Sequence, residues 1–179
     1  MRVLEVRRHS LVKDHVHLSQ AGIELAGRVG ADMGPFDRVV TSHITRTLET
    51  AVAMGFAVDD QWSVLGEIEP DVWAEVGHHE RWDWDEPFAA FARLVEVGGA
   101  TARLGHAQAE LWRAILRDLP EDGRALVVSH GRVIEAGAVA CVPNVDHAAW
   151  GQPFGKCEGL RLAYDGDAWI APELLRVAG

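Results

Sequence analysis

The sequence predicts an α/β fold, a three-layer sandwich in which a mostly parallel mixed sheet is flanked by helices. Two observations support this prediction. Short apolar runs typical of buried strands alternate with stretches whose apolar residues recur every three or four positions, which is the helical period. Near the C-terminus, two alternating runs flank Asp165-Gly166, a pattern typical of a hairpin, and this hairpin would add an antiparallel edge.

The first part of the chain contains two strand–helix units. Residues 3–6 form a short run typical of a strand, and after Ser19 apolar residues recur at helical spacing as far as Met33. A second strand is expected over residues 37–41. It precedes a helical pattern that starts near Ile44 and stops at Gly55.

The middle of the chain has a different composition. Residues 66–86 are acidic and rich in tryptophan, with little periodicity, so we predict an inserted loop region. Helical spacing returns at Phe88, pauses at Gly98 and continues to Pro120, which indicates two helices. We therefore expect one domain over residues 1–179, with a loop and helix insertion at about residues 66–100.

The last part of the chain returns to the strand–helix pattern. Residues 125–128 have the length and apolarity of a strand buried on both faces, and a helical pattern follows over residues 133–142. The hairpin then pairs the alternating residues 160–164 with a strand that begins at Trp169.

Composition excludes several classes of function. The chain has 179 residues, of which 48% are hydrophobic, enough for a sizeable core, and its formal net charge is −10. That charge argues against general binding to nucleic acid or to anionic membranes. Because the chain has neither a signal-like segment nor an apolar stretch of ~20 residues, we expect a cytoplasmic protein.

The sequence does not indicate a metal or another cofactor. Cys141 and Cys157 are too few and too poorly spaced for a thiolate site, and we expect them to be buried thiols. The histidine pairs at residues 15 and 17 and at residues 78 and 79 lack an accompanying ligand set. We interpret both pairs as loop histidines.

Candidate catalytic residues follow the predicted strands. His9 and His130 each come at a strand end and precede a small residue, and ligands gather at the carboxyl ends of strands in open α/β sheets. Arg8 lies beside His9, and a third strand end leads to Arg46 within one helical turn. Guanidinium groups offer fixed forks of N–H donors that suit a phosphate dianion.

These residue types together point to phosphoryl transfer. A neutral imidazole can attack phosphorus and carry the phosphoryl group, provided that the pocket neutralises the oxygens of the transition state. Arg8, Arg46 and a protonated His130 would supply that charge. Backbone N–H groups after His9 and at the start of the helix after His130 would add donors.

Four motifs then occur in an order that points to one family. Residues 8–10 (Arg-His-Ser) resemble an Arg-His-Gly signature, and residues 18–22 resemble a Leu-Thr-x-x-Gly helix start. Residues 42–51 resemble a Ser-Pro-x-x-Arg…Thr-Ala helix, and residues 128–131 match a Val-Ser-His-Gly turn. In this order the chain resembles the histidine phosphatase superfamily, also called phosphoglycerate-mutase-like, from its first predicted strand to beyond residue 131.

The resemblance implies roles for individual residues. Arg8 and Arg46 would bind phosphate, His9 would become phosphorylated, and His130 would complete the pocket, in a reaction that needs no metal. The resemblance also implies an acid from a Leu-x-Glu segment, for which Glu67 is our choice and Glu69 the second. The predicted substrate-binding groups are Arg8, Ser10, Arg46, His130 and Gly131.

Three positions depart from the family pattern. Ser10 stands where the family has glycine, which implies either ordinary backbone dihedrals or a mildly strained turn. His43 replaces a proline at the entry to a helix. Arg132 replaces a glycine after His130 and adds a cation near the pocket.

Several residues near the motifs have two interpretations. We interpret Arg7 as a surface or ion-pair arginine, because its side chain points away from that of Arg8 on an extended strand. His15 and His17, with Lys13 beside them, either line the substrate entrance or belong to a solvated loop. A set of tryptophans forms either a cap over the pocket or part of the core: Trp73, Trp82 and Trp84. If the acidic segment from Glu67 to Glu86 borders the pocket, it favours neutral or cationic substrates.

The short chain favours a phosphatase over a mutase. Only eight residues separate His9 from Leu18, which leaves little room for phosphoglycerate contacts. We expect the substrate to be a small phosphate ester or a phosphoprotein. The alternatives are a phosphoglycerate-mutase-type phosphotransferase and a catalytically weak regulatory module that binds phosphate, and the oligomeric state stays open.

Overall fold

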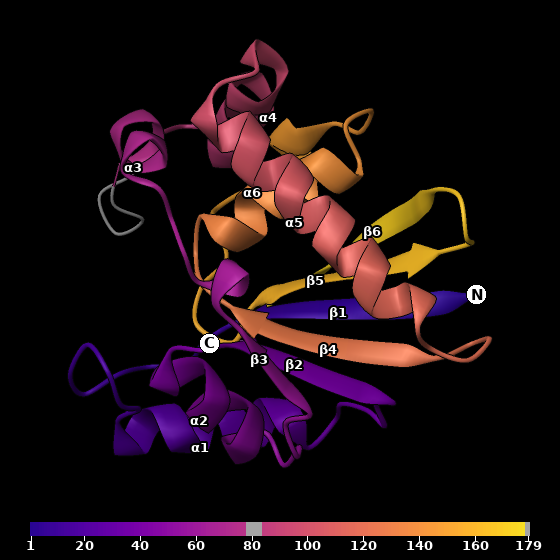
Figure 1. The fold of residues 1–179 in the computed structure, drawn as a ribbon. Coiled ribbons are helices and arrows are strands. Elements are labelled where there is room, and N and C mark those ends of the chain that lie inside the picture. The colour runs from indigo at the N-terminus through magenta and orange to yellow at the C-terminus, as the bar shows by residue number, and fades with distance from the viewer. Residues whose placement is uncertain (78–83, 178–179) are drawn as a thin grey trace.

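A six-stranded mixed sheet forms the centre of the computed structural model, which describes residues 1–77 and 84–177 (Figure 1). The strands are β1 (Arg2–Arg8), β2 (Arg38–Ser42), β3 (Asp60–Trp62), β4 (Arg124–Ser129), β5 (Gly159–Tyr164) and β6 (Trp169–Leu175). Their order is β3-β2-β4-β1-β5-β6. The first four strands in this order run parallel, and β5 and β6 are antiparallel to their neighbours. The predicted mixed sheet with an antiparallel edge is confirmed.

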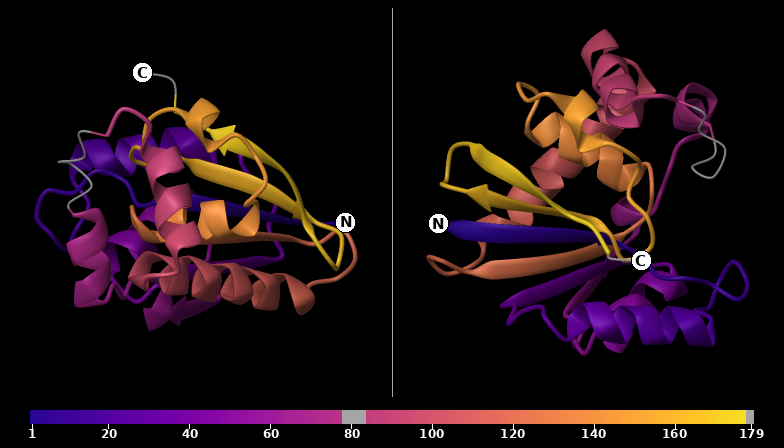
Figure 2. Two further views of the ribbon diagram at one scale, coloured as in Figure 1. Left: turned by 90° about the horizontal axis from the view of Figure 1, so that it is seen from above. Right: turned by 180° about the vertical axis from the view of Figure 1, so that it is seen from behind.

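Helices cover both faces of the sheet. The helix α1 (Gln20–Gly30) and the helix α2 (Thr45–Ala53) lie together on one face. On the other face lie α5 (Ala100–Arg117) and α6 (Val133–Cys141), with α4 (Pro87–Val97) packed on them (Figures 1 and 2). The three layers of the predicted sandwich are therefore present.

The burial of β4 explains why a continuous apolar run over residues 125–128 correctly predicted a strand. Ala125 and Val127 belong to the larger core cluster, together with residues of α4, α5 and α6 such as Phe88, Trp112 and Ile134. The alternate residues of β4, Leu126 and Val128, belong to a smaller cluster with Val39 and Ala51. Both faces of this central strand are buried, so its four middle positions, residues 125–128, are all apolar.

The start of α1 also agrees with its sequence. The hydroxyl of Ser19 accepts a hydrogen bond from the backbone N–H of Gly22 at 3.0 Å, which is the usual N-cap arrangement. Gly22 is required for a separate reason, because a Cβ there would lie 2.0 Å from the carbonyl oxygen of Leu11. The loop that follows β1 thus packs directly on the first turn of α1.

The predicted loop region over residues 66–86 is wrong in one part, because it contains a helix, α3 (Pro70–Val76). Pro70 occupies the first turn, and Val72 and Val76 are buried. The carboxylate of Glu75 accepts hydrogen bonds from the backbone N–H groups of Ala100 and Thr101, which fixes α3 to the start of α5. A helix of two turns has too few apolar positions to reveal its period. The strand β3 and a following 3₁₀ turn, Ser63–Leu65, were likewise too short to predict.

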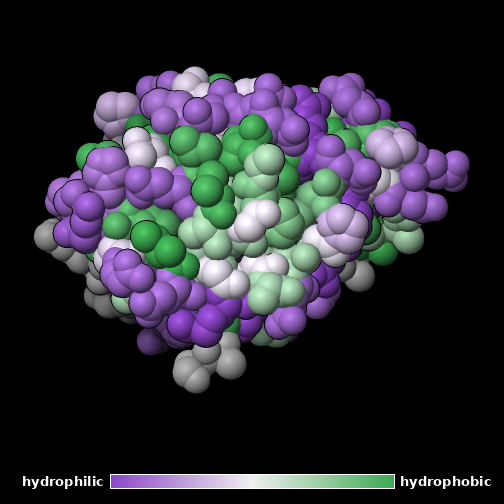
Figure 3. Space-filling view, turned by 90° about the horizontal axis from the view of Figure 1, so that it is seen from below, coloured by the Kyte–Doolittle hydropathy of each residue, from purple (hydrophilic) through white to green (hydrophobic). Residues whose placement is uncertain are grey.

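The outer surface of α1 and α2 carries apolar side chains. Figure 3 looks at the molecule from below and shows apolar residues within a hydrophilic rim. Ile23 of α1 and Val52 of α2 are among the large apolar side chains exposed to solvent. Within the described part of the chain, no helix is both long and apolar enough to cross a membrane.

Candidate active site

Three neighbouring parallel strands bring the predicted catalytic residues to one edge of the sheet. The strands β2, β4 and β1 end at Ser42, Ser129 and Arg8, and Arg8 is directly opposite Ser129 in the register. The backbone N–H of His9 extends the pairing by donating to the carbonyl of Ser129 at 3.0 Å. As a result, the ring centroids of His9 and His130 are 5.3 Å apart.

Both histidines line a cavity of about 480 Å³. Its walls are formed by Arg8, His9, Val12, His15, Arg46, Trp73, His130, Gly131, Arg132 and Lys156. Five predicted site residues, at positions 8, 9, 46, 130 and 131, therefore meet in one place. Among the described residues, no group of three or more histidine, cysteine or carboxylate side chains is arranged to hold a metal ion.

The imidazole of His9 is held in one orientation and one protonation state. Its Nδ1 lies 2.8 Å from the carbonyl oxygen of Ser10. A carbonyl oxygen only accepts, so Nδ1 carries the proton and Nε2 keeps its lone pair. Burial, followed by the charge of Lys156, lowers the pKa of His9 to about 2. At neutral pH the ring is therefore the neutral nucleophile that phosphoryl transfer requires.

His130 is also neutral in this structure, whereas the protonated form was predicted for the reaction with phosphate. Its Nδ1 accepts from Nη2 of Arg46 at 3.3 Å, so Nε2 carries the proton and donates to the hydroxyl of Ser42 at 2.8 Å. Burial, then the charges of Arg46 and Arg8, lowers the pKa of His130 to about 3. A phosphate dianion beside the ring would oppose this effect, because an opposite charge favours the protonated form.

The two predicted phosphate-binding arginines are held by backbone carbonyls. Nη1 of Arg8 donates to the carbonyl of Phe154 at 2.9 Å, and Nη1 of Arg46 donates to the carbonyl of His15 at 2.6 Å. Burial and the charge of Arg8 lower the pKa of Arg46. Two guanidinium groups held so close together repel each other, and a bound anion would relieve that repulsion.

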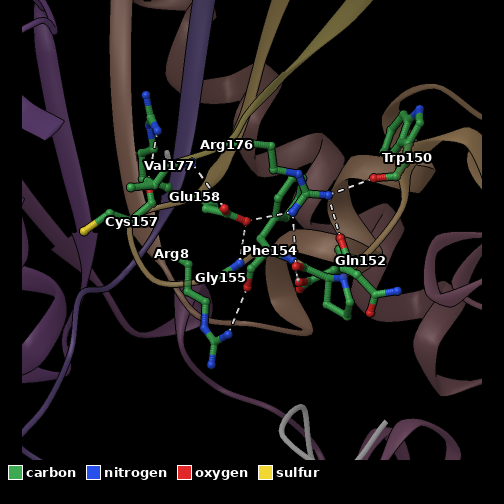
Figure 4. Close-up of polar contacts among 12 residues, drawn as sticks. Arg8, Trp150, Gln152, Phe154, Gly155, Cys157, Glu158, Arg176 and Val177 are labelled. Carbon is green, nitrogen blue, oxygen red and sulfur yellow. Dashed lines mark hydrogen bonds and ion pairs between the residues drawn. The ribbon is translucent and has the colours of Figure 1, made fainter. Parts of the chain in front are cut away.

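A loop before β5 supplies the partner of Arg8 and one more cation, Lys156. Figure 4 shows how this loop is held: Arg176 donates to the carbonyls of Trp150 and Gln152 and to the carboxylate of Glu158. The backbone of Arg8 in turn donates to the carbonyl of Glu158 at 2.8 Å. Lys156 was not predicted from the sequence, because no local pattern indicates that this loop folds back onto the end of β1.

Ser10 does not take the substrate-binding role predicted for it. Its backbone N–H donates to Oγ1 of Thr50 at 3.0 Å, and its hydroxyl donates to the carbonyl of Gly22 at 2.7 Å. Ser10 is fully buried, and it has none of the unusual positive φ angles found elsewhere in the chain. It therefore joins the end of β1 to α1 and α2, and this structure removes it from the set of substrate contacts.

Glu67 and Glu69 lie outside the histidine cavity, contrary to the prediction that Glu67 is the acid. Both are exposed, and both line a separate cavity of about 240 Å³ between α3 and α5. The chain does pass the site one residue earlier, since a Cβ on Gly66 would lie 3.1 Å from Nε2 of His130. Glu67 itself lines the separate cavity, as does Gln108.

The structure decides between the two interpretations given for the residues near the motifs. Arg7 is a buried ion-pair residue, with Nη2 at 2.7 Å from the carboxylate of Glu5. His15 lines the cavity, whereas Nδ1 of His17 lies 2.7 Å from the carboxylate of Glu49. Cys141 and Cys157 are buried thiols, as predicted.

The tryptophans have different surroundings. Trp73 lines the histidine cavity from α3, whereas Trp84 packs edge-on against Phe91 with ring centroids 5.8 Å apart. Trp82 and the histidine pair at residues 78 and 79 lie outside the described residues. The described acidic residues at 67, 69 and 71 line the separate cavity, and Glu75 holds the start of α5.

Solved structures share this fold over almost the whole chain. Phosphoserine phosphatase from Entamoeba histolytica, solved with 3-phosphoglyceric acid, has a TM-score of 0.72 at 18% identity, covering 99% of this chain and 98% of that one. A mycobacterial glucosyl-3-phosphoglycerate phosphatase has a TM-score of 0.71 at 20% identity, with 99% and 100% covered. Phosphoglycerate mutase from Bacillus anthracis has a TM-score of 0.63 at 16% identity, with 94% and 90% covered.

The sequence itself decides the family. A search of curated protein sequences found no significant match. In contrast, the family model described as histidine phosphatase superfamily (branch 1) matches residues 7–174, which include both histidines and both phosphate-binding arginines predicted here. The chain therefore belongs to the histidine phosphatase superfamily, branch 1.

Proposed function

We propose that this protein is a phosphatase that hydrolyses phosphate monoesters through a phosphohistidine on His9, without a metal ion. The observation that carries the proposal is the state of His9. Its Nδ1–H is bound to the Ser10 carbonyl, Nε2 keeps its lone pair, and burial lowers its pKa to about 2. The ring also lines a cavity with Arg8 and Arg46, whose guanidinium groups would hold phosphoryl oxygens.

The reaction follows from these positions in two steps. First, the Nε2 lone pair of His9 forms a bond to phosphorus as the bond from phosphorus to the ester oxygen breaks, and the leaving oxygen takes up a proton from solvent. Second, water attacks phosphorus and gives up a proton to solvent, the nitrogen–phosphorus bond breaks, and inorganic phosphate leaves with neutral His9 restored. The charge of the transition state would be met by Arg8, Arg46 and Lys156, with His130 protonated once the dianion is bound.

Hydrolysis is favoured over phosphoryl exchange by the kinds of protein that share the fold. Two of the similar structures are named as phosphatases, one for phosphoserine and one for glucosyl-3-phosphoglycerate. The mutase with the same fold supports the alternative of phosphoglycerate-mutase-type transfer, which a direct assay separates. The cytoplasmic location expected from the sequence stays a prediction.

Hydrolysis of p-nitrophenyl phosphate in EDTA tests the proposal. We expect the wild type to be active and His9→Ala to lose at least about 10³-fold in kcat, because the covalent route is closed. His106→Ala is the matched control, since His106 is an exposed histidine on α5 away from the cavity, and it should keep wild-type activity. Equal rates for the wild type and His9→Ala would overturn the nucleophile assignment.

Phosphoryl exchange between phosphoglycerates, measured in the same preparation, decides between the two activities. We expect little exchange where hydrolysis is robust. Exchange that outruns release of inorganic phosphate would instead identify a mutase. Phosphate binding without either reaction would identify the catalytically weak module.

A further inference from the structure

Arg132 has a backbone conformation that residues other than glycine rarely adopt. Its φ is 77° and its ψ is −55°, at the turn between His130 and the start of α6. For a residue with a long side chain, a positive φ is strained, and such strain clusters at functional sites. Glycine would adopt this turn without that strain.

Specific contacts hold Arg132 in this conformation. Its backbone N–H donates to the carboxylate of buried Glu135 at 2.6 Å, and its Nε donates to the carbonyl of Gly77 at 2.7 Å. The guanidinium carbon lies 3.6 Å from the centroid of a Trp73 ring. Only 6% of Arg132 is exposed, yet the residue lines the cavity that contains His9. These contacts therefore hold the backbone of Arg132 in its strained conformation and keep its guanidinium group oriented at the active site.

The phosphoryl group is already served by other cations. After burial, the pKa of His9 is lowered chiefly by Lys156 and that of His130 by Arg46 and Arg8, so these three charges are near the reacting atoms. Arg132 is not among the charges that principally lower either pKa, although it lines the same cavity. It is placed with Trp73, on the side of the cavity formed by α3.

From this arrangement we infer that Arg132, stacked on Trp73, binds a second anionic group, a carboxylate or a phosphate, on the leaving group of the substrate. The inference rests on the proposed phosphatase function and adds its substrate class. A planar guanidinium stacked on an aromatic ring presents its N–H donors edge-on, which is the geometry that carboxylates and phosphates accept. The preference for neutral or cationic substrates was expected only if the acidic segment borders the pocket, and residues 67, 69 and 71 of that segment line the separate cavity instead.

Two substrates that differ in one group test the inference. Glycerol 3-phosphate and 3-phosphoglycerate have the same carbon chain, but the second carries a carboxylate in place of a terminal hydroxymethyl group. We expect the wild-type kcat/KM for 3-phosphoglycerate to exceed that for glycerol 3-phosphate by at least about tenfold, in line with a charge-assisted hydrogen bond. Propane-1,3-diyl bisphosphate, compared with propyl phosphate, tests a second phosphate in the same way.

Variants of Arg132 decide whether that preference depends on it. Arg132→Gln should lower the 3-phosphoglycerate to glycerol 3-phosphate ratio by about tenfold or more. Arg132→Gly should lower it equally, and this variant should fold because glycine accepts the positive φ. Arg103→Gln is the control, since Arg103 is exposed and lines only the separate cavity among those described, and it should keep the wild-type ratio.

The outcomes separate this inference from the function on which it rests. If the wild type hydrolyses no ester, the proposed function fails. If it hydrolyses the esters but prefers neither anionic substrate, or if the Arg132 variants keep the wild-type ratios, the inference fails while the function stands. A ratio that falls for only one of the two pairs identifies which anion Arg132 binds.

Discussion

The two ends of the active-site cavity are built in different ways. At the phosphoryl end, Arg8 and His9 lie at the end of β1, and His130 follows β4, so the pairing of parallel strands fixes their positions. At the leaving-group end, Trp73 comes from a seven-residue helix, and 37% of the Trp73 surface is exposed. Arg132 lies in a strained turn. The phosphoryl end is anchored by the sheet, whereas the leaving-group end depends on side-chain contacts.

Chemistry and specificity are thus placed on different parts of the chain. The strand ends are set by the most deeply buried part of the fold, and a change there would disturb the core. In the proposals above, the strand ends carry the reaction, whereas Arg132 and Trp73 contact the leaving group.

The largest effect is expected from breaking the phosphoryl end at Arg46. Arg46→Ala should lower kcat/KM for p-nitrophenyl phosphate by about 10³-fold, because it removes a guanidinium that meets the charge of the transition state. Arg46→Lys should recover only part of the loss, since an ammonium group cannot reproduce the fork. Steady-state kinetics with Arg103→Ala as control tests this. A loss of less than tenfold in Arg46→Ala would contradict the site.

Acid should weaken folding through the same end of the cavity. The folded-state pKa values of His9 and His130, about 2 and about 3, lie below the unfolded value of 6.5. The unfolded state therefore binds more protons below pH 6.5. The stability that these groups contribute is present above that pH and is lost as the pH falls toward the folded pKa values. Between pH 7 and pH 5 we expect a loss of about 2 kcal/mol per histidine.

Urea unfolding at pH 7 and pH 5, in buffers without phosphate, measures this loss. His9→Gln cannot be protonated in this range, so its loss of stability between the two pH values should be about 2 kcal/mol smaller than that of the wild type. A wild-type free energy of unfolding that is flat between these two pH values would contradict the neutral state of both rings.

Ser10 distinguishes a structural role from a substrate contact. Ser10→Ala removes the hydrogen bond to the carbonyl of Gly22 and should cost about 1–3 kcal/mol of stability. The kcat should stay within about twofold at a temperature where the variant is folded. A hundredfold loss of kcat without any loss of stability would restore the substrate-binding role that the sequence suggested.

The smallest effect is expected at Glu67, whose side chain lies in the separate cavity. Glu67→Gln should change kcat by less than about threefold, both for p-nitrophenyl phosphate and for glycerol 3-phosphate. The two substrates are compared because the alkoxide of glycerol 3-phosphate needs a proton to leave, whereas p-nitrophenolate does not. A loss of about 10² confined to glycerol 3-phosphate would show that Glu67 turns into the active site and acts as the acid.

The sequence predicted best what local patterns determine. The runs before His9 and His130 are apolar because their strands are buried, and a residue after a parallel strand has only one edge of the sheet to occupy. Lys156 escaped prediction because its position depends on a loop that Arg176 holds from beyond β6. Glu67 was misplaced for a related reason: the cavity that it lines depends on how α3 packs on α5, which no local pattern indicates.

A direct search for phosphate on His9 tests the central claim. The wild type would be mixed rapidly with p-nitrophenyl phosphate, quenched in alkali to preserve the acid-labile bond, and digested for mass spectrometry. We predict one phosphate on His9, formed within the first turnover and absent from His9→Ala. Turnover with no phosphate on His9, or with the phosphate on another residue, would contradict the account.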